Sequence, residues 1–300
     1  MTDIPTLNKQ FAVPNIATVD AGSGGLPRVR IDSPAAEAEI YLHGGHVTRW
    51  MPHGHKPVLF MSSESLFDPA KAIRGGVPLI FPWFGPNPTN PKAPQHGFAR
   101  TTPWTLRGIS TGADAATSVE LGLTSTDTSR GHWPHNFDAT FTVTVGKTLD
   151  MALEVVNKSQ AEFTFEEALH TYLAVGDIRQ TTIDGLAGRE YLDKVDKAAR
   201  KKQAAGAFTL SGETDRVYLN SPDTVTVNDA ANGRKIVVSK SGSASTIVWN
   251  PWVDKSKAMA DFGDDEWPAM LCIETANAAE NAVKLAPGAR HVMRATIAVQ

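Results

Sequence analysis

The chain has very little cysteine and no large excess of charge of either sign. Its 300 residues include one cysteine, Cys272, which cannot form an internal disulfide. That excludes a disulfide-framed secreted scaffold and any cysteine-rich zinc site. Lys and Arg number 29 against 32 Asp and Glu, a formal net charge of -3. Because nucleic-acid binding is driven largely by positive charge, nucleic acid is not an expected partner.

Signals for secretion and for a membrane are also missing. Residues 1–9 contain neither a basic segment nor a following apolar stretch, so we expect a cytoplasmic protein. The longest uncharged stretch near the middle, residues 75–91, is rich in proline, which a membrane-spanning helix does not tolerate. With 41% hydrophobic residues, the chain can instead build the core of an ordinary globular protein.

Alternation of apolar and polar residues dominates the sequence and predicts half-buried strands. It is clearest in residues 36–42, 118–124, 140–145, 224–228 and 290–297. Turn residues separate these tracts at short intervals, as in antiparallel sheets packed face to face. We therefore expect an all-β antiparallel sandwich with few short helices, forming a single domain over residues 1–300 with a loose N-terminal segment of ~20 residues. The basic tract 191–205 is expected to be a solvated loop or a short helix.

Two histidines and two charged residues stand out as candidates for chemistry. Counting by twos places Glu166, Ala168, His170 and Tyr172 on one strand face and Phe163, Phe165, Leu169 and Leu173 on the other. His96 precedes Gly97, a residue that allows an unusual backbone angle or a close contact. Glu274 ends an apolar run, where a carboxylate must reach water or serve a site. Arg74 could bind a phosphate or a carboxylate, although a surface salt bridge is an equal alternative.

The remaining histidines are better explained by structure than by chemistry. His43 and His46 flank Gly44-Gly45 and indicate close backbone approach at a tight turn. The others lie in segments where a histidine needs no chemical role. His53 and His55 lie in an expected exposed turn, His132 and His135 in a loop anchored by Trp133, and His291 in a terminal strand. The His132/His135 loop could also line a sugar-binding cleft.

Several tracts, taken in order, resemble one family. They are Arg74-Gly-Gly-Val-Pro-Leu-Ile-Phe-Pro-Trp-Phe-Gly, Gln95-His-Gly-Phe-Ala-Arg, Glu167-Ala-Leu-His-Thr-Tyr, Glu213-Thr-Asp-Arg-Val-Tyr, Val248-Trp-Asn-Pro-Trp and Cys272-Ile-Glu-Thr-Ala-Asn. From about Val29 to the C-terminus, the chain is similar to the hexose-6-phosphate mutarotases (glucose-6-phosphate 1-epimerases) of the aldose 1-epimerase superfamily. The resemblance implies a galactose-mutarotase-type β-sandwich with an open cleft on one sheet.

The resemblance also implies roles for individual residues. Glu274 becomes the general base, His170 the general acid, and His96 a second histidine that contacts the sugar. Asp215 would hold ring hydroxyls, while Arg74, Gln95 and Arg100 would engage the phosphorylated sugar. Interconversion of the α and β anomers needs a proton taken from the anomeric hydroxyl and one given to the ring oxygen, and it requires no metal or redox cofactor. The expected partner is a small phosphosugar, preferably D-glucose 6-phosphate, and the expected state is a monomer.

Other functions stay open at this point. A non-catalytic phosphosugar-binding sandwich would not require both Glu274 and His170. A mutarotase for a neutral aldose such as galactose would not require Arg74 and Arg100 in the cleft. A metal-dependent sugar isomerase needs a compact cluster of metal ligands, which the spacing does not indicate. Trp249 and Trp252 could line the cleft or pack in the core.

Overall fold

The computed structural model describes residues 3–87, 89–112 and 115–300, and it consists mainly of antiparallel strands. The all-β prediction is therefore confirmed. The α-helices are short: α1 Ile4–Phe11, α2 Asp127–His132 and α3 Trp252–Lys257. Single turns of 3₁₀ helix join the strands: η1 Ser23–Gly25, η2 Ala99–Thr101, η3 Ile178–Gln180, η4 Lys194–Asp196, η5 Ala230–Asn232, η6 Trp267–Ala269 and η7 Ala279–Asn281. Within the described ranges, no helix has the length and apolar composition to cross a bilayer.

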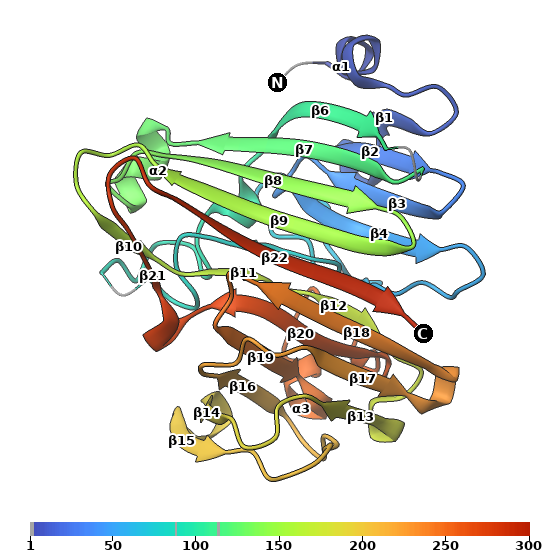
Figure 1. Ribbon diagram of the computed structural model, residues 1–300, viewed down its shortest axis with the longest axis vertical. Coiled ribbons are helices and arrows are strands. Elements are labelled where there is room, and N and C mark those ends of the chain that lie inside the picture. Colours follow the sequence, from blue (N-terminus) through green and yellow to red (C-terminus); the bar gives the residue numbers. More distant parts are fainter. Residues whose placement is uncertain (1–2, 88, 113–114) are drawn as a thin grey trace.

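The front sheet of Figure 1 is eight-stranded and runs along the molecule in the order β13-β17-β18-β22-β9-β8-β7-β6. Its strands include most of the alternating tracts predicted from the sequence, and β8 alternates strictly between buried and half-buried residues. Their bounds are β13 Thr181–Asp184, β17 Val225–Asp229, β18 Arg234–Ser241, β22 Arg290–Val299, β9 Thr148–Asn157, β8 Phe137–Val145, β7 Thr117–Thr124 and β6 Thr105–Thr111.

Behind it lies a second eight-stranded sheet, the back sheet, in the order β15-β14-β16-β19-β20-β11-β5, with β12 also paired to β20. Its strands are β15 Ala199–Lys202, β14 Glu190–Asp193, β16 Thr214–Tyr218, β19 Ser245–Asn250, β20 Met270–Asn277, β11 Glu167–Leu169, β5 Leu79–Ile80 and β12 Tyr172–Ala174. Two smaller sheets complete the fold: β1 Ala17–Ala21, β2 Pro27–Asp32, β3 Ala36–Tyr41 and β4 His46–Pro52 form one, and β10 Phe163–Phe165 with β21 Val283–Leu285 forms the other.

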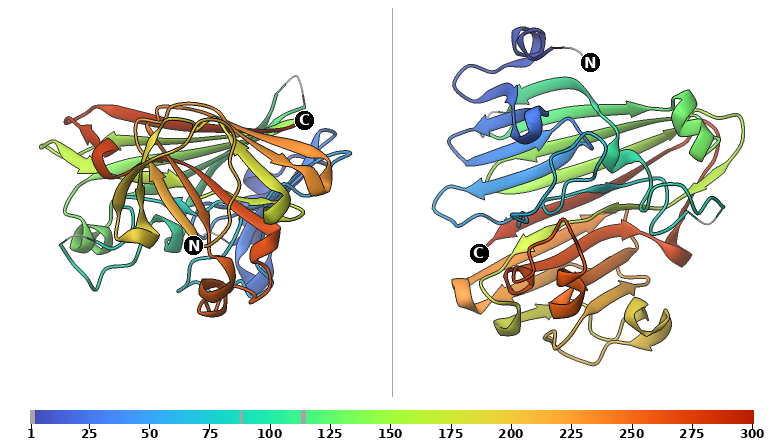
Figure 2. Two further views of the ribbon diagram at one scale, coloured as in Figure 1. Left: turned by 90° about the horizontal axis from the view of Figure 1, so that it is seen from below. Right: turned by 180° about the vertical axis from the view of Figure 1, so that it is seen from behind.

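The main core lies between these layers, which Figure 2 shows from two further sides. On β20, Leu271 and Ile273 point into this core, whereas Cys272 belongs to a separate apolar cluster on the outer face of the back sheet. Strand alternation thus gives the back sheet one face for the core and one face for a site. The main core draws on residues from Leu7 to Ile297, so we continue to expect a single domain.

Two local expectations differ from the structure. The tract 191–205 contains the short helix η4, but it is built as an antiparallel hairpin of β14 and β15, in which Lys201 pairs with Asp193 across the strands. Residues 3–21, which make up most of the segment expected to be loose, contain α1 and β1. Leu7 of α1 is buried, and Asn8 exchanges two hydrogen bonds with the backbone of Val19, which ties the helix to the first strand.

Candidate active site

A cavity of about 600 Å³ opens on the outer face of the back sheet. Every site residue predicted from the sequence lies in its lining: Arg74, Gln95, His96, Arg100, His170, Asp215 and Glu274. A smaller hollow of about 360 Å³ between α1 and β6 has no ionisable side chain in its lining and so no groups for acid–base chemistry. The structure therefore brings together residues that are spread over two hundred positions of the sequence.

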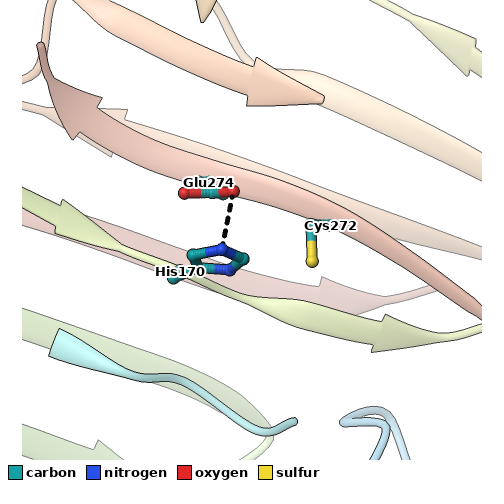
Figure 3. A group of neighbouring side chains, drawn as sticks. All are labelled: His170, Cys272 and Glu274. Atoms are coloured by element: carbon teal, nitrogen blue, oxygen red, sulfur yellow. Dashed lines mark ion pairs between the residues drawn. The ribbon is translucent and has the colours of Figure 1, made fainter. Parts of the chain in front are cut away.

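Glu274 and His170 face each other on adjacent strands of the back sheet (Figure 3). Glu274 lies in the middle of β20 and is 1% exposed, while His170 follows β11 and is 9% exposed. The Nε2 atom of His170 lies 3.3 Å from Oε1 of Glu274. This distance brings the two groups close enough to share a proton, directly or through a substrate oxygen.

Burial moves both groups toward their uncharged forms. It raises the pKa of the Glu274 carboxyl well above its usual value, and the nearby charge of Asp215 adds to this effect. Burial also lowers the pKa of His170, helped by His96 and by the positive charges of Arg100 and Arg74. Burial thus shifts the proton affinities of the carboxyl and the imidazole in opposite directions, away from the order they have in water, as suits a pair that exchanges protons with a substrate.

His96 is held by its own backbone in a left-handed conformation, with φ of 63°. Its backbone N–H donates to the carbonyl of Gly85, and the N–H of Gly85 donates back to Nδ1 of the His96 ring at 3.1 Å. Burial, followed by the charges of Arg100 and Arg74, lowers the pKa of His96 to about 3. The ring is therefore neutral with its proton on Nε2, so His96 can donate a hydrogen bond but is not a strong acid.

Gly97 explains the shape of this loop. Its φ is 73°, and a Cβ atom at this position would lie 1.9 Å from the carbonyl oxygen of Phe81. The predicted unusual backbone and close contact are thus both present. The turn at Gly44 makes a similar approach, because a Cβ there would lie 2.5 Å from the carbonyl oxygen of Arg100, which confirms the prediction of a close backbone contact between His43 and His46.

The two arginines differ in how they are held. Arg74 donates from Nε and Nη2 to one oxygen of Asp261, at 3.2 and 3.0 Å, and from Nη1 to the Tyr172 hydroxyl. Arg100 donates from Nη2 to the carbonyl oxygen of Gln95, but its buried Nε atom has no partner. Of the two arginines, Arg100 therefore has hydrogen-bonding capacity left over for a ligand.

Asp215 lies at the other end of the cavity. Strand register places Asp215 opposite Trp249, Trp249 opposite Cys272, and Cys272 opposite Tyr172. Three strand spacings of about 4.8 Å separate Asp215 from Tyr172, or roughly 14 Å across the sheet. A ligand in the cavity thus has a carboxylate at one end, the arginines at the other, and the Glu274–His170 pair between them.

Sequence reasoning missed several residues that line this cavity or support it. Phe84, Lys194, Lys255 and Met259 line the cavity, while Asp261 holds Arg74. Glu166, expected on the same face as His170, accepts hydrogen bonds from the backbone of Phe84 and Ala279, and Phe84 packs edge-on against His96. The sequence shows basic residues clustered around Lys194, but no local pattern identifies Asp261 as a partner of Arg74.

The structure shows where Trp249, Trp252 and the His132/His135 loop lie relative to the cavity. Trp249 lines the cavity and contacts His170 edge-on at 6.0 Å between ring centroids. Trp252 packs against Trp267 outside the lining. The His132/His135 loop also lies outside it, and the His135 ring packs against Trp133 at 4.6 Å. That loop has the packing role that the sequence favoured.

Comparison with known proteins gives the family. Residues 27–298 match the sequence profile of aldose 1-epimerases. A protein of Escherichia coli strain K12 with the provisional name glucose-6-phosphate 1-epimerase is 39% identical over 255 residues, which cover 85% of this chain and 84% of the relative. One from Cenchrus ciliaris with the same provisional name is 37% identical over 84% of this chain and 78% of its own length.

Solved structures agree with this family assignment. The crystal structure of YeaD from Salmonella typhimurium, provisionally described as a mutarotase, has a TM-score of 0.89 at 32% identity and covers 96% of this chain and 95% of its own. A galactose mutarotase-like protein from Clostridium acetobutylicum, at 14% identity and a TM-score of 0.72 over 95% of this chain and 98% of its own, shows the shared fold. The predicted galactose-mutarotase fold and the predicted resemblance are thus confirmed, and the chain belongs to the aldose 1-epimerase family.

Proposed function

We propose that the protein is an isomerase that interconverts the α and β anomers of a hexose 6-phosphate, with D-glucose 6-phosphate as the preferred substrate. The observation that carries this proposal is a buried carboxyl–imidazole pair, 3.3 Å apart, in the same cavity as a guanidinium with a buried, unpartnered N–H. The provisional names of the E. coli and Cenchrus ciliaris relatives support the same substrate.

In the proposed reaction, Glu274 takes the proton of the anomeric hydroxyl while His170 gives a proton to the ring oxygen. The ring opens to the aldehyde, which rotates about one bond, and the two proton transfers then run in reverse to close the ring on its other face. His96, neutral and with its proton on Nε2, donates a hydrogen bond to the sugar. No net change of charge or oxidation state occurs, so neither a metal nor a redox cofactor is required.

The phosphate supplies more than binding energy in this scheme. Both Arg100 and Arg74 depress the pKa of His170, whereas only Arg100 acts noticeably on Glu274. A phosphate dianion beside the arginines offsets their field and therefore raises the pKa of His170 toward the protonated form that ring opening needs. Substrate binding thus prepares the acid for ring opening.

Substrate recognition follows the two ends of the cavity. Arg100 would bind the phosphate directly, Arg74 would add charge while held by Asp261, and the exposed Gln95 would reach the same group. Asp215 would accept hydrogen bonds from ring hydroxyls. Because both arginines line the cavity, a neutral aldose is the weaker alternative. The proposal includes a monomer acting in the cytoplasm without nucleic-acid or membrane partners.

The test follows the approach of freshly dissolved α-glucose 6-phosphate to anomeric equilibrium by NMR exchange. We expect clear acceleration over buffer, and Glu274→Gln or His170→Asn should each lower the rate by about 10²- to 10⁴-fold. The chain offers a matched control, because Glu167 is equally buried and lies 2.9 Å from His291 on the opposite face of the back sheet. Glu167→Gln should leave the rate unchanged. No acceleration by the intact protein, or equal losses in the control, would refute the proposal.

A further inference from the structure

Cys272 is a buried nucleophile that the proposed reaction does not use. It is fully buried, next to the acid–base pair, in the apolar cluster of the outer face. A nitrogen of His170, the sulfur of Cys272 and a carboxylate oxygen of Glu274 all lie within 4.8 Å of one another. Figure 3 shows these side chains gathered on neighbouring strands. Among the residues that the structure describes, this is the one group of three or more such ligands with this spacing.

The polar atoms of this group have bonding capacity to spare. Nδ1 of His170 and Oε2 of Glu274 are both buried and have no hydrogen-bond partner. Buried polar atoms are normally satisfied, so unpartnered ones on residues that line a cavity indicate capacity for a further ligand. One nitrogen, one sulfur and one oxygen are the donors that Zn²⁺ and related ions bind in proteins.

The spacing is close to that of a three-ligand site. Zn²⁺ binds these donors at about 2.0–2.3 Å, which in a tetrahedron separates the ligands by roughly 3.3–3.8 Å. The observed limit of 4.8 Å therefore requires the side chains to move inward by about 1 Å. Three protein ligands leave a fourth position, and His170 and Glu274 lie at the cavity wall, so water could occupy it.

We propose that His170, Cys272 and Glu274 form a binding site for a thiophilic divalent ion of the Zn²⁺ and Cd²⁺ class, and that this ion inhibits the protein by occupying its acid–base pair. Binding the ion releases the thiol proton of Cys272 and the proton shared by His170 and Glu274, and no group is oxidised or reduced. The inhibition rests on the proposed function, whereas the binding does not.

Affinity for the ion should increase with pH. The ion must displace the thiol proton of Cys272, and the affinity of a thiol for a metal ion increases with pH for this reason. The ion and the sugar should also exclude each other, since both need the same two side chains. Saturating glucose 6-phosphate is therefore expected to slow metal inhibition.

The binding test uses Cd²⁺ and sugar-free protein, followed by the ultraviolet absorption of the cadmium–thiolate bond. Because the chain has one cysteine, any such band reports Cys272. We expect one ion per chain, no band in Cys272→Ser or Cys272→Ala, and affinity at least about tenfold weaker in His170→Asn and Glu274→Gln. His55→Ala, on an exposed turn, is the matched control and should bind like the parent. A missing band, or a band whose affinity is unchanged in both ligand variants, would overturn the site.

The inhibition test adds Zn²⁺ to the anomerisation assay. The parent protein should lose activity, while Cys272→Ser and Cys272→Ala should keep their activity and resist the ion, because Cys272 lies outside the cavity lining. Circular dichroism confirms that each variant is folded, and two substitutions guard against one failing to fold. Binding without inhibition would support the metal site and contradict the proposed role of the acid–base pair, so the two failures can be told apart.

Discussion

Replacing Arg100 with methionine should make the protein more stable and less active at the same time. The buried Nε atom of Arg100 has no partner. Burial, together with the charge of Arg74, lowers the pKa of Arg100 from 12.5 to about 10. The folded chain therefore disfavours the charge, and at neutral pH, below both values, the penalty is fully present. It corresponds to at most about 3 kcal/mol, which methionine would relieve without leaving a large cavity.

The same substitution removes the proposed phosphate contact. A hydrogen bond to a charged group contributes about 1.5–3 kcal/mol, and a bidentate guanidinium makes two of them. Since 1.4 kcal/mol is a factor of ten, kcat/KM for glucose 6-phosphate should fall by roughly 10²- to 10⁴-fold. Activity on glucose should change far less, because glucose has no charge at that position.

Urea unfolding and NMR anomer exchange measure the two effects. Arg107→Met is the matched control, since Arg107 lies on the front sheet and donates to Asp138 and Thr140. It should lose a little stability and no activity. A less stable Arg100→Met protein would show that the buried guanidinium is not a source of strain. Equal losses for glucose and glucose 6-phosphate would remove the phosphate role from Arg100.

Further predictions concern the second arginine, the opposite face of the sheet and the His96 loop. Asp261→Asn should lower KM for glucose 6-phosphate severalfold, because the amide oxygen can still hold Arg74 while a negative charge near the phosphate is removed. Burial alone would lower the pKa of His291, but its hydrogen bond and charge interaction with Glu167 outweigh burial and raise it. The stability from this pair is complete below the unfolded-state pKa and is lost as pH rises through the raised folded-state pKa. Urea unfolding should therefore show stability that declines as pH rises above about 6.5, the usual pKa of histidine, and His291→Asn should abolish that decline. Gly97→Ala should abolish anomerisation and destabilise the fold, because its Cβ would lie 1.9 Å from a carbonyl oxygen.

Each of these predictions has a result that would contradict it. An increased KM for Asp261→Asn would mean that the carboxylate mainly orients Arg74. A decline with pH that persists in His291→Asn would assign it to other groups. Gly288→Ala is the control for Gly97→Ala, since Gly288 has the same φ of 73° and lies outside the cavity lining, and a Cβ there meets nothing within 4 Å. Similar damage in both variants would attribute the effect to backbone angle alone.

Strand alternation was the most informative feature of the sequence. It correctly separated Phe165 and Leu169, which enter the main core, from Ala168 and Tyr172, which belong to the outer cluster. The same alternation accounts for Cys272 and Glu274 lying together on one face of β20. A period of two is a local property, so residues close in sequence suffice to determine it.

Long-range contacts could not be predicted in the same way. Arg74 contacts Asp261 across 187 residues of sequence. The hairpin of β14 and β15 depends on cross-strand pairs such as Lys201 with Asp193. In the sequence these residues appear only as part of a run of charged side chains, which does not show how they pair. The pairing of arginines with carboxylates and the pairing of the basic tract into a hairpin are decided by tertiary structure, and these are the points where the sequence prediction was incomplete or wrong.

The cavity draws its two kinds of residue from different parts of the chain. The side chains assigned to the phosphate all come from the connection between β4 and β6, whereas Asp215 and Glu274 lie on β16 and β20, and His170 directly follows β11. Acid–base chemistry thus rests on regular strands that also form the core, while recognition of charge rests on a single connecting segment. A change of substrate charge could therefore arise at the cavity-lining positions of that segment, while its strand β5, its core residues and the reacting groups stay as they are.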